Sequence, residues 1–364
     1  MSANTSASPF EVSWFGSLCD DDYEFLGHRE PSLRSTFEHC RGILQRAEEG
    51  GFDNILLPSG YQLGIDTIAF ASAMAPLTSR IRMLMAVRCA ELFPPQLARQ
   101  LATVQEMLQG RSTINIISSD LPGAPVDSAP RYARSLEVMS ILRTLLNGED
   151  LSHQGEFYNL ELEAPRVCKE TAAAYGGCPP FYFGGISPAA RETAAAAADV
   201  FLMWPDVEKE VTGIVEDMRA RATAHGRRLK FGYRVHVIVR ESEGEAMDYT
   251  RRLMRKFDAD KGAEIKGQSL DSKTEGVRRQ DAMRANADAD GFAEDHLWTG
   301  IGRARSGCSA ALVGDPDQIA AKINRYAELG MGAFILSGYP HATECDLFAR
   351  YVLPQLNHGP LTLD

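Results

Sequence analysis

The run Lys230-Phe-Gly-Tyr-Arg-Val-His-Val-Ile-Val239 is the longest of eight strand-like segments in this chain. Its residues are mostly β-branched, aromatic or otherwise apolar, which is typical of a strand that is buried on both faces of a parallel sheet. Seven shorter runs of similar character lie on either side of it along the chain. The eight expected strands cover residues 10–18, 54–58, 81–88, 113–118, 180–184, 200–204, 230–239 and 333–339.

Amphipathic segments with the period of an α-helix lie between these strands. Glycines stand just after several of them, where a left-handed residue commonly ends a helix. No G-x-G-x-x-G follows the first strand, which disfavours an open dinucleotide-binding sheet. Eight strands with helices between them therefore predict an α/β fold of the (β/α)8 TIM barrel type. The expected helices cover residues 36–50, 66–75, 96–108, 133–146, 207–225 and 317–329.

The domain organisation follows from this count. A chain of 364 residues has room for two average domains, but a barrel of this type fills such a length as one unit. We expect a disordered tail at 1–9 and a single domain at 10–357. Irregular insertions are expected at about 151–177, after helix 4, and 241–309, after strand 7. The second insertion is a lid or a solvated excursion, and its place beside the catalytic face of a barrel favours a lid.

Composition excludes several classes of protein. The formal charge of −11, from 49 acidic and 38 basic residues, disfavours nucleic acid and anionic membrane as partners. No apolar run approaches the roughly 20 residues that span a bilayer, and the first residues lack the pattern of a secretory signal. Seven cysteines without a C-x-x-C pair are typical of reduced thiols. We therefore expect a cytoplasmic globular protein.

Polar residues gather at the carboxyl ends of the last three strands, where barrels carry their catalytic groups. Trp204 follows strand 6, Arg234 and His236 lie in strand 7, and Tyr339 and His341 follow strand 8. Residues i and i+2 of a strand point the same way, so these side chains are expected to converge. A buried arginine is costly unless it meets an anion. Arg234 therefore predicts an anion-binding pocket, or else an ion pair with a carboxylate of the next helix.

Other chemistries find little support. No spacing typical of zinc ligands, nucleophile elbow or P-loop is present, so no metal site is expected. The run Asp20-Asp21-Asp22 could ligate a hard cation, although acidic loops are usually just solvated. Phe183-Gly-Gly-Ile-Ser187 has the form of a phosphate cradle, with glycines before a helix start. An ordinary N-cap by Ser187 is the alternative.

Several motifs identify a family resemblance. Phe231-Gly-Tyr-Arg-Val-His-Val-Ile-Val-Arg240, Leu312-Val-Gly-Asp315 and Ile335-Leu-Ser-Gly-Tyr-Pro-His341 carry it, and it extends from about residue 12 to residue 356. The chain resembles the flavin-dependent alkanesulfonate monooxygenases of the bacterial luciferase-like superfamily. The resemblance implies that reduced FMN (FMNH2), supplied by a separate NAD(P)H-dependent flavin reductase, reacts with O2 and that a C–S bond is cleaved to sulfite and an aldehyde. It also implies a homodimer or homotetramer.

The resemblance also implies roles for single residues. The sulfonate pocket and its catalytic groups are assigned to Trp204, Arg234, His236, Arg305, Tyr339 and His341. A guanidinium fork suits a permanently anionic sulfonate, and the segment around Arg305 is expected to close over the site. Residues expected to contact the flavin ring are Arg88, Asn115 and Ser118, and those expected at its phosphate are Tyr132, Gly185, Ile186 and Ser187. Asn115 and Tyr132 also have purely structural interpretations, in strand-end hydrogen bonding and helix-start packing.

Two departures from the family pattern affect the predicted substrate. The stretch Gly60-Tyr-Gln-Leu-Gly-Ile-Asp66 lacks the cysteine expected after strand 2, and Ser17-Leu-Cys-Asp20 lacks the histidine expected after strand 1. Gly64 would leave space, while Asp20 to Asp22 and Gln62 supply partners for hydroxyl groups. These features favour a bulkier, hydroxylated organosulfonate, such as the sugar sulfonate sulfoquinovose.

Three alternatives remain at this point. One is an oxidoreductase of the same superfamily that uses the deazaflavin F420. A second is another reduced-FMN monooxygenase in which Arg234 holds a carboxylate or an amide oxygen. The third is a non-catalytic protein that binds a flavin or a sulfonate.

Overall fold

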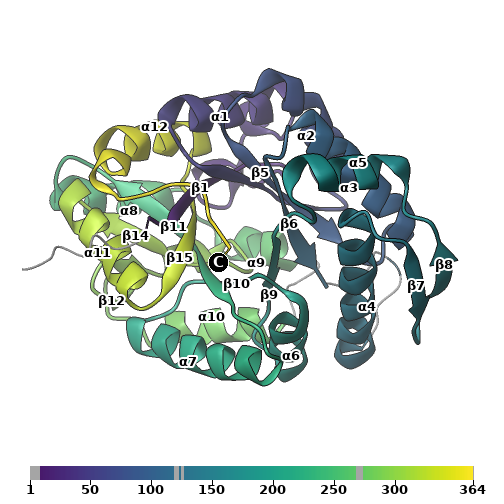
Figure 1. The fold of residues 1–364 in the computed structure, drawn as a ribbon. Coiled ribbons are helices and arrows are strands. Elements are labelled where there is room, and N and C mark those ends of the chain that lie inside the picture. Colours follow the sequence, from purple (N-terminus) through teal and green to yellow (C-terminus); the bar gives the residue numbers. More distant parts are fainter. Residues whose placement is uncertain (1–8, 119–122, 124–126, 268–273, 364) are drawn as a thin grey trace, which may run out of the picture.

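The computed structural model describes residues 9–118, 123, 127–267 and 274–363 (Figure 1). Eight parallel strands form a closed barrel, because the last strand pairs with the first and every neighbouring pair is hydrogen-bonded. The predicted TIM barrel is therefore confirmed. In barrel order the strands are β1 (Glu11–Phe15), β4 (Asn54–Leu57), β5 (Arg82–Arg88), β6 (Ser112–Ile117), β9 (Phe181–Gly184), β10 (Val200–Met203), β11 (Lys230–Val239) and β15 (Met331–Ser337).

Helices surround the barrel (Figure 1). Thr36 and Asp66 accept hydrogen bonds from the first turns of α1 and α2, as N-cap residues do. Gly51 has a φ of 91° at the end of α1, a conformation that glycine adopts without a steric penalty. The surrounding helices are α1 (Phe37–Gly50), α2 (Thr67–Met74), α3 (Pro94–Met107), α4 (Ser128–Leu146), α6 (Pro188–Ala197), α7 (Glu208–Ala224), α8 (Glu243–Met254), α11 (Pro316–Glu328) and α12 (His341–Tyr351).

The core has two layers, because successive side chains of a strand point to opposite faces. In β1, Trp14 packs outward in the layer between strands and helices, whereas Phe15 points into the barrel. The interior layer also contains Tyr182 of β9 and Ile335 of β15. Both layers are densely apolar, which explains why the strands read as continuous apolar runs in the sequence.

The amino-terminal end of the barrel is closed by the C-terminal segment, which crosses its centre (Figure 1). The backbone N–H of Leu361 donates to the buried carboxylate of Glu11 at 3.2 Å, and the Tyr182 hydroxyl donates to the same carboxylate at 2.8 Å. Burial raises the pKa of Glu11 despite these bonds. The opposite, carboxyl-terminal end of the strands is the one left open.

The first insertion is more regular than we expected. Instead of an irregular stretch, residues 151–175 form a β-hairpin and a helix, so that expectation is wrong. Glu137 of α4 fixes the hairpin turn, because its carboxylate accepts hydrogen bonds from the backbone of residues 156–158. The elements are β7 (Leu151–Gln154), β8 (Asn159–Leu162) and α5 (Arg166–Tyr175).

The second insertion lies over the open end of the barrel. β11 is long enough to pair with two strands besides β15. Its first half pairs with β10, and residues 236–239 pair with β14. The insertion therefore continues the sheet beyond the barrel itself. Its elements after α8 are α9 (Ala259–Gly267), α10 (Glu275–Ala285), β12 (Phe292–Glu294), β13 (Leu297–Trp298), η3 (Gly300–Arg303) and β14 (Ala311–Gly314).

Short elements complete the chain. A two-stranded ribbon follows β1, and three single 3-10 turns join longer elements. These are β2 (Tyr23–Phe25), β3 (His28–Arg29), η1 (Pro31–Leu33), η2 (Ala75–Leu77) and η4 (Leu353–Gln355). The expected tail at residues 1–9 lies outside the described residues, apart from Pro9.

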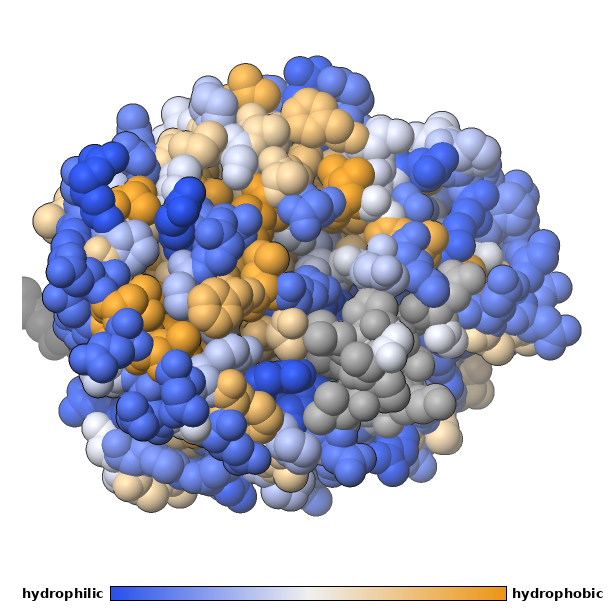
Figure 2. Space-filling view, turned by 90° about the vertical axis from the view of Figure 1, so that its right-hand side faces the viewer, coloured by the Kyte–Doolittle hydropathy of each residue, from blue (hydrophilic) through white to orange (hydrophobic). Residues whose placement is uncertain are grey.

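One side of the molecule is shown in Figure 2. Hydrophilic side chains form most of the outline of this face, and apolar side chains lie in groups between them. Among the described residues, no helix is both long and apolar enough to span a membrane.

Candidate active site

A cavity of about 930 Å³ opens at the carboxyl ends of the barrel strands. Its wall contains a residue from the end of nearly every strand, including Phe15, Arg88, Asn115 and Arg234, and the second insertion supplies the opposite wall. This volume lies at the upper end of the roughly 300–1,000 Å³ that is usual for small-molecule sites. The cavity therefore has room for a large cofactor together with a substrate.

Arg234 is the most deeply placed cation of this wall, with 3% of its surface exposed. Its guanidinium donates to Ser337 Oγ at 2.8 Å and to the Ile335 carbonyl at 3.3 Å. Among the described residues its hydrogen-bond partners are two backbone carbonyls and the Ser337 hydroxyl, and it forms no ion pair with a carboxylate, so the alternative of a carboxylate partner on the next helix does not hold. A buried cation without a counter-ion favours an anionic ligand.

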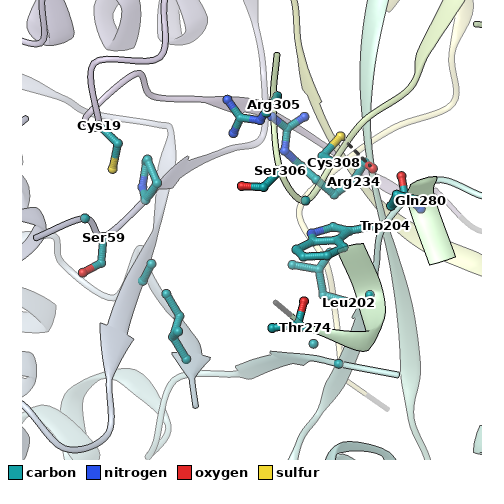
Figure 3. Close-up of a pocket in the computed structure, with 18 of the residues that line it drawn as sticks. Cys19, Ser59, Leu202, Trp204, Arg234, Thr274, Gln280, Arg305, Ser306 and Cys308 are labelled. Carbon is teal, nitrogen blue, oxygen red and sulfur yellow. Dashed lines mark hydrogen bonds between the residues drawn. The ribbon is translucent and has the colours of Figure 1, made fainter. Parts of the chain in front are cut away.

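Arg305 lies beside Arg234, from the segment that precedes β14 (Figure 3). It donates to Asp21 at 2.5 Å and to the Tyr339 hydroxyl at 3.0 Å. Both guanidinium groups lie over the Phe15 ring, at 4.3 Å for Arg234 and 5.4 Å for Arg305. An aromatic face stabilises cations without neutralising them.

The charges of this cluster do not balance. Two guanidinium groups face the single carboxylate of Asp21, which leaves one positive charge. Burial would raise the pKa of Asp21, but the charge of Arg305, the nearby His341 and the hydrogen bonds from Arg305 and Ser17 together outweigh burial, and the pKa lies below its usual range. Because Asp21 stays ionised, one monovalent anion would bring the cluster to neutrality.

His236, Tyr339 and His341 are brought together by the fold but lie deeper than Arg234 and Arg305, and unlike these two arginines they do not line the cavity. Each is at most 1% exposed. The Tyr339 ring lies 5.0 Å from His236 and 5.3 Å from His341. Burial, followed by the charges of Arg234 and Arg305, holds the pKa of His236 well below its usual range. The ring is therefore uncharged at neutral pH.

Trp204, after β10, lines the cavity on the side across from Ser59 (Figure 3). It is packed so closely that a Cβ on Gly276 would lie 2.7 Å from its ring, and one on Gly307 would lie 3.0 Å away. The buried Gln280 of α10 donates to the Pro205 carbonyl at 2.6 Å and accepts from Ser309 at 2.6 Å. These bonds hold α10 over the cavity.

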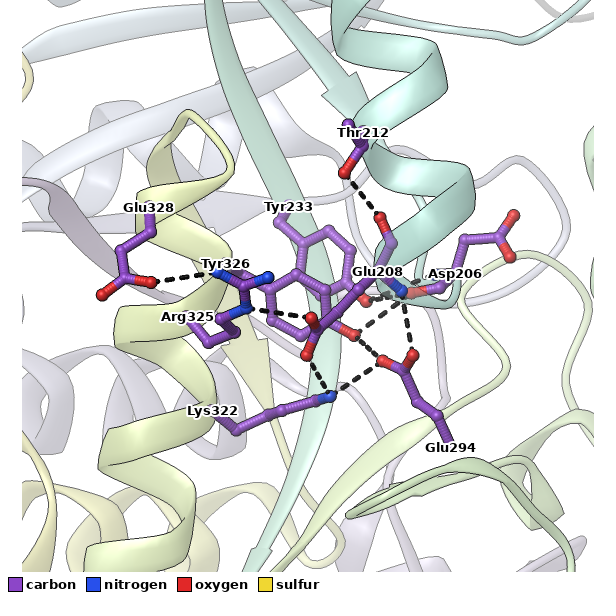
Figure 4. A network of polar contacts seen from close by, with 9 residues as sticks. All are labelled: Asp206, Glu208, Thr212, Tyr233, Glu294, Lys322, Arg325, Tyr326 and Glu328. Atoms are coloured by element: carbon purple, nitrogen blue, oxygen red, sulfur yellow. Dashed lines mark hydrogen bonds and ion pairs between the residues drawn. The ribbon is translucent and has the colours of Figure 1, made fainter.

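A network of polar contacts supports this wall from behind (Figure 4). Lys322 Nζ lies 2.8 Å from Glu208 and 2.9 Å from Glu294. The Tyr233 hydroxyl, which extends from β11, donates to the Asp206 carbonyl at 3.0 Å. Asp206 also pairs with Arg279 of α10. The loop after β10 is thus fixed on both sides.

The residues expected at a flavin ring line the side of the cavity formed by β5 and β6. Arg88 donates to the Ser59 carbonyl at 2.9 Å. Ser118 is hydrogen-bonded to Ser135 of α4 at 2.5 Å. Asn115 faces the cavity from β6. Together they present donors on one side of the open space.

The expected phosphate cradle also lines the cavity. Gly185 has a φ of 141°, and a Cβ there would lie 2.7 Å from Ala190 and 3.2 Å from the Tyr132 hydroxyl. No larger residue fits, so the backbone is open at this point. Ser187 caps α6 by accepting from the Ala190 N–H at 3.3 Å, and Ile186 completes the turn. An open glycine backbone before a helix N-terminus fits the phosphate of FMN.

The residues expected to bind substrate hydroxyls have different surroundings. Gln62 is exposed at the mouth of the cavity. Asp20 lines the cavity too, but its carboxylate accepts from the Ser35 N–H at 2.7 Å. Gly64 does not provide space for a ligand as we expected. It has a φ of 85°, and a Cβ there would lie 1.7 Å from the Leu18 carbonyl oxygen, so a close backbone approach requires glycine.

Sequence reasoning missed three residues of this site, and it offered a fourth, Asp21, only as a partner for substrate hydroxyls or as a cation ligand. Phe15 and Ser337 lie in strands that read as ordinary core, and Gln280 lies in a polar helix. Asp21 belongs to an acidic run whose members are indistinguishable in the sequence. The sequence contains two signals for such residues. One is the polar Ser337 in the strand expected beside the strand of Arg234, and the other is the acidic run after strand 1. Neither signal identifies a partner.

Comparisons with known proteins agree with this geometry. A family model described as luciferase-like monooxygenase matches residues 24–332. A protein of Novosphingobium aromaticivorans named sulfoquinovose monooxygenase is 58% identical over 360 residues, which cover 97% of this chain and 98% of that protein. One of the same name from Agrobacterium fabrum is 49% identical over 348 residues, covering 95% of this chain and 89% of that protein.

Solved structures share the fold. Riboflavin lyase, crystallised with modified FMN and riboflavin, superposes with a TM-score of 0.77 and covers 98% of this chain and 94% of its own. Its sequence is 16% identical, so this similarity concerns the fold alone.

Proposed function

The chain belongs to the luciferase-like monooxygenase family, and on that premise we propose that it desulfonates a sugar sulfonate, sulfoquinovose. In this proposal FMNH2, supplied by a separate NAD(P)H-dependent flavin reductase, and O2 are consumed, and the C–S bond is cleaved to sulfite and an aldehyde. The working unit is a homodimer or homotetramer. The two relatives named sulfoquinovose monooxygenase support the choice of substrate.

The observation that carries the proposal is the excess positive charge in the cavity wall. Arg234 and Arg305 share the Phe15 ring, and only Asp21 opposes them among the described side chains. A sulfonate is anionic at every biological pH, and planar guanidinium groups suit its oxygens better than a point charge does. One sulfonate would neutralise the cluster.

A reduced flavin supplies electrons that activate O2, which is the chemistry this proposal requires of the cofactor. Gly185 and Ser187 would hold its phosphate, with Tyr132 and Ile186 beside them. Arg88, Asn115 and Ser118 would contact its ring. The fit rests on the open glycine backbone and the volume of the cavity.

The remaining side chains would bind and orient the substrate. Arg234 and Arg305 hold the sulfonate, while His236, Tyr339 and His341 set the polarity around it. His341 is fixed by its backbone N–H, which donates to Asp22 at 2.9 Å. Trp204 and α10 cover the cavity and exclude water, which strengthens the electrostatic contacts inside it.

Hydroxyl recognition would come from groups near the mouth, with Gln62 as the exposed donor and acceptor. Asp20 contributes only through the carboxylate oxygen that Ser35 leaves unused. In this proposal the sugar end of the substrate points toward solvent and the sulfonate end toward Phe15.

The test supplies FMNH2, O2 and one sulfonate at a time, and measures sulfite. We expect release from sulfoquinovose and much less from octanesulfonate. The matched control replaces FMNH2 by reduced F420. Oxidation of reduced F420 by a member of the substrate panel, without O2 uptake and without sulfite, would favour the deazaflavin alternative, and binding without any turnover would favour a carrier protein. Turnover of carboxylates instead of sulfonates would show that Arg234 holds a different anion.

A further inference from the structure

Arg234, Ser337 and His236 form a chain of hydrogen bonds inside the barrel. The guanidinium of Arg234 donates to Ser337 Oγ at 2.8 Å, and Ser337 Oγ lies 2.7 Å from His236 Nδ1. The strands impose this arrangement, because His236 of β11 stands in register with Ser337 of β15. All three residues are at most 3% exposed, so water does not compete for these bonds.

The direction of each hydrogen bond follows from the chemistry of the groups. A guanidinium has donors only, so Ser337 Oγ must accept from Arg234. The one hydroxyl hydrogen of Ser337 is then left to donate. Within the part of the chain that the structure describes, His236 Nδ1 is the acceptor that lies in reach of this hydroxyl.

The opposite arrangement carries a penalty. If His236 Nδ1 carried the hydrogen, Ser337 Oγ would accept two hydrogen bonds, and its own hydrogen would be buried without an acceptor. Buried donors without partners are destabilising. The Nδ1–H tautomer leaves two buried groups unpaired, the Ser337 hydrogen and the Nε2 lone pair, whereas the Nε2–H tautomer leaves only its own N–H unpaired. Nδ1 is therefore the acceptor, and the ring hydrogen lies on Nε2.

We propose that Ser337 is a positioning residue that holds His236 in the Nε2–H tautomer, so that His236 donates a hydrogen bond to the sulfonate held by Arg234. The tautomer follows from the hydrogen-bond chain alone. The role toward a sulfonate rests on the proposed function.

Two further observations support this role. His236 Nε2 is buried and has no hydrogen-bond partner among the described residues, and His236 lies directly behind the cavity wall that Arg234 lines. A hydrogen at this position stays unpaired until the acceptor atom of a ligand reaches it. The charged and titratable groups around the ring are Arg234, Arg305, His341, Tyr339 and Cys308, and the pKa of His236 is lowered by burial, by the two arginines and by His341, with a smaller opposing effect from the Cys308 backbone. An uncharged ring attracts an anion through Nε2 only if Nε2 carries hydrogen.

The tautomer is measured by nitrogen NMR on ligand-free protein with ¹⁵N-labelled histidine. His236→Gln identifies the signals of His236 among the eight histidines. We expect protonated Nε2 and unprotonated Nδ1 in the wild type. We expect that pattern to be lost or mixed in Ser337→Ala and restored in Ser337→Thr, which keeps a hydroxyl.

Ser13→Ala is the matched control, because Ser13 is another fully buried serine of the barrel and its hydroxyl donates to Glu11. It should leave the His236 signals unchanged. Protonated Nδ1 in the wild type, or an unchanged tautomer in Ser337→Ala, would overturn the proposal. If Ser337→Ala does not fold, the wild type and Ser337→Thr spectra still decide it, because an Nδ1–H wild type is incompatible with the proposal.

Kinetics test the donor role separately. Ser337→Ala should raise KM for sulfoquinovose about tenfold, the size expected for one hydrogen bond to an anion, and Ser337→Thr should restore it. An unchanged KM together with a changed tautomer would overturn the donor role. If the wild type releases no sulfite, the proposed function fails, and the NMR result still decides what Ser337 does.

Discussion

Lys322 and Arg234 are both buried cations, but their surroundings differ. Lys322 is 8% exposed and lies within 2.9 Å of two carboxylates, in a network that also fixes the loop after β10. Arg234 is 3% exposed, and its described partners are uncharged oxygens and an aromatic ring. A buried charge is expensive unless it is paired. The difference indicates that Lys322 stabilises the fold, whereas Arg234 is kept for an anion from outside the chain.

The substitution Arg234→Lys tests this difference between Arg234 and Lys322 most directly. Lysine keeps the charge and loses the planar fork, so we expect kcat/KM for sulfite release to fall about 1,000-fold, with little loss of thermal stability. Sulfite assays and thermal melts measure the two effects. Activity within about twofold of wild type, or a large fall in melting temperature, would make Arg234 a structural residue like Lys322.

Lys322→Met should show the reverse pattern. It leaves Glu208 and Glu294 without their cation, so we expect the free energy of unfolding to fall by about 3 kcal/mol, while kcat/KM of the folded enzyme stays within about twofold. Urea unfolding measures the change. Arg325→Met is the matched control: Arg325 pairs with the same Glu208 but is 50% exposed, so its loss should cost less than about 1 kcal/mol. Equal losses in both variants would contradict the assigned role of Lys322.

In the proposed function, the two arginines contact the same sulfonate group in every substrate. Preference for one sulfonate over another must therefore come from other groups of the site. The protein groups that hydrogen-bond to sugar hydroxyls have no partner when an alkanesulfonate is bound. We therefore expect kcat/KM for sulfoquinovose to exceed that for octanesulfonate about 100-fold. Gln62→Ala should reduce this ratio, and Asp20→Asn should reduce it less. A better rate with octanesulfonate would remove the specificity argument.

The smallest expected effect is a dependence of stability on pH. Burial, followed by the charges of Arg234 and Arg305, lowers the pKa of His236 well below its usual range. Below about pH 6.5 the unfolded chain binds a proton that the folded ring does not, so stability falls with decreasing pH by at most about 1.4 kcal/mol per pH unit for this group. Urea unfolding at pH 7 and pH 5.5 should show a smaller fall in His236→Gln than in wild type. Equal falls would mean that His236 is charged in the folded protein.

Much of the fold could be predicted from the sequence, because each signal is local. The eight barrel strands and their helices follow from apolar runs, helical periodicity and glycine positions. The i and i+2 spacing put Arg234 and His236 on one face, and they do lie together. The insertion at 151–175 was misjudged because its hairpin is held by Glu137, which belongs to a different element.

The candidate site was only partly predictable, since its energetics depend on contacts between distant parts of the chain. Asp21 and Arg305 are 284 residues apart, and no spacing rule joins them. Gly64 was predicted to leave space for a ligand. In the structure the backbone of Leu18 lies so close that only glycine fits at this position.

By itself, the sequence determined which residues form strands and helices and which chemical groups stand at the strand ends, because periodicity and residue type act over a few positions. Only the tertiary structure decided which charges are paired. Closure of the barrel brings Phe15, Asp21 and Ser337 against Arg234, Arg305 and His236. The free energy of a buried charge depends on the groups within a few ångströms of it, and those groups come together only when β15 pairs with β1.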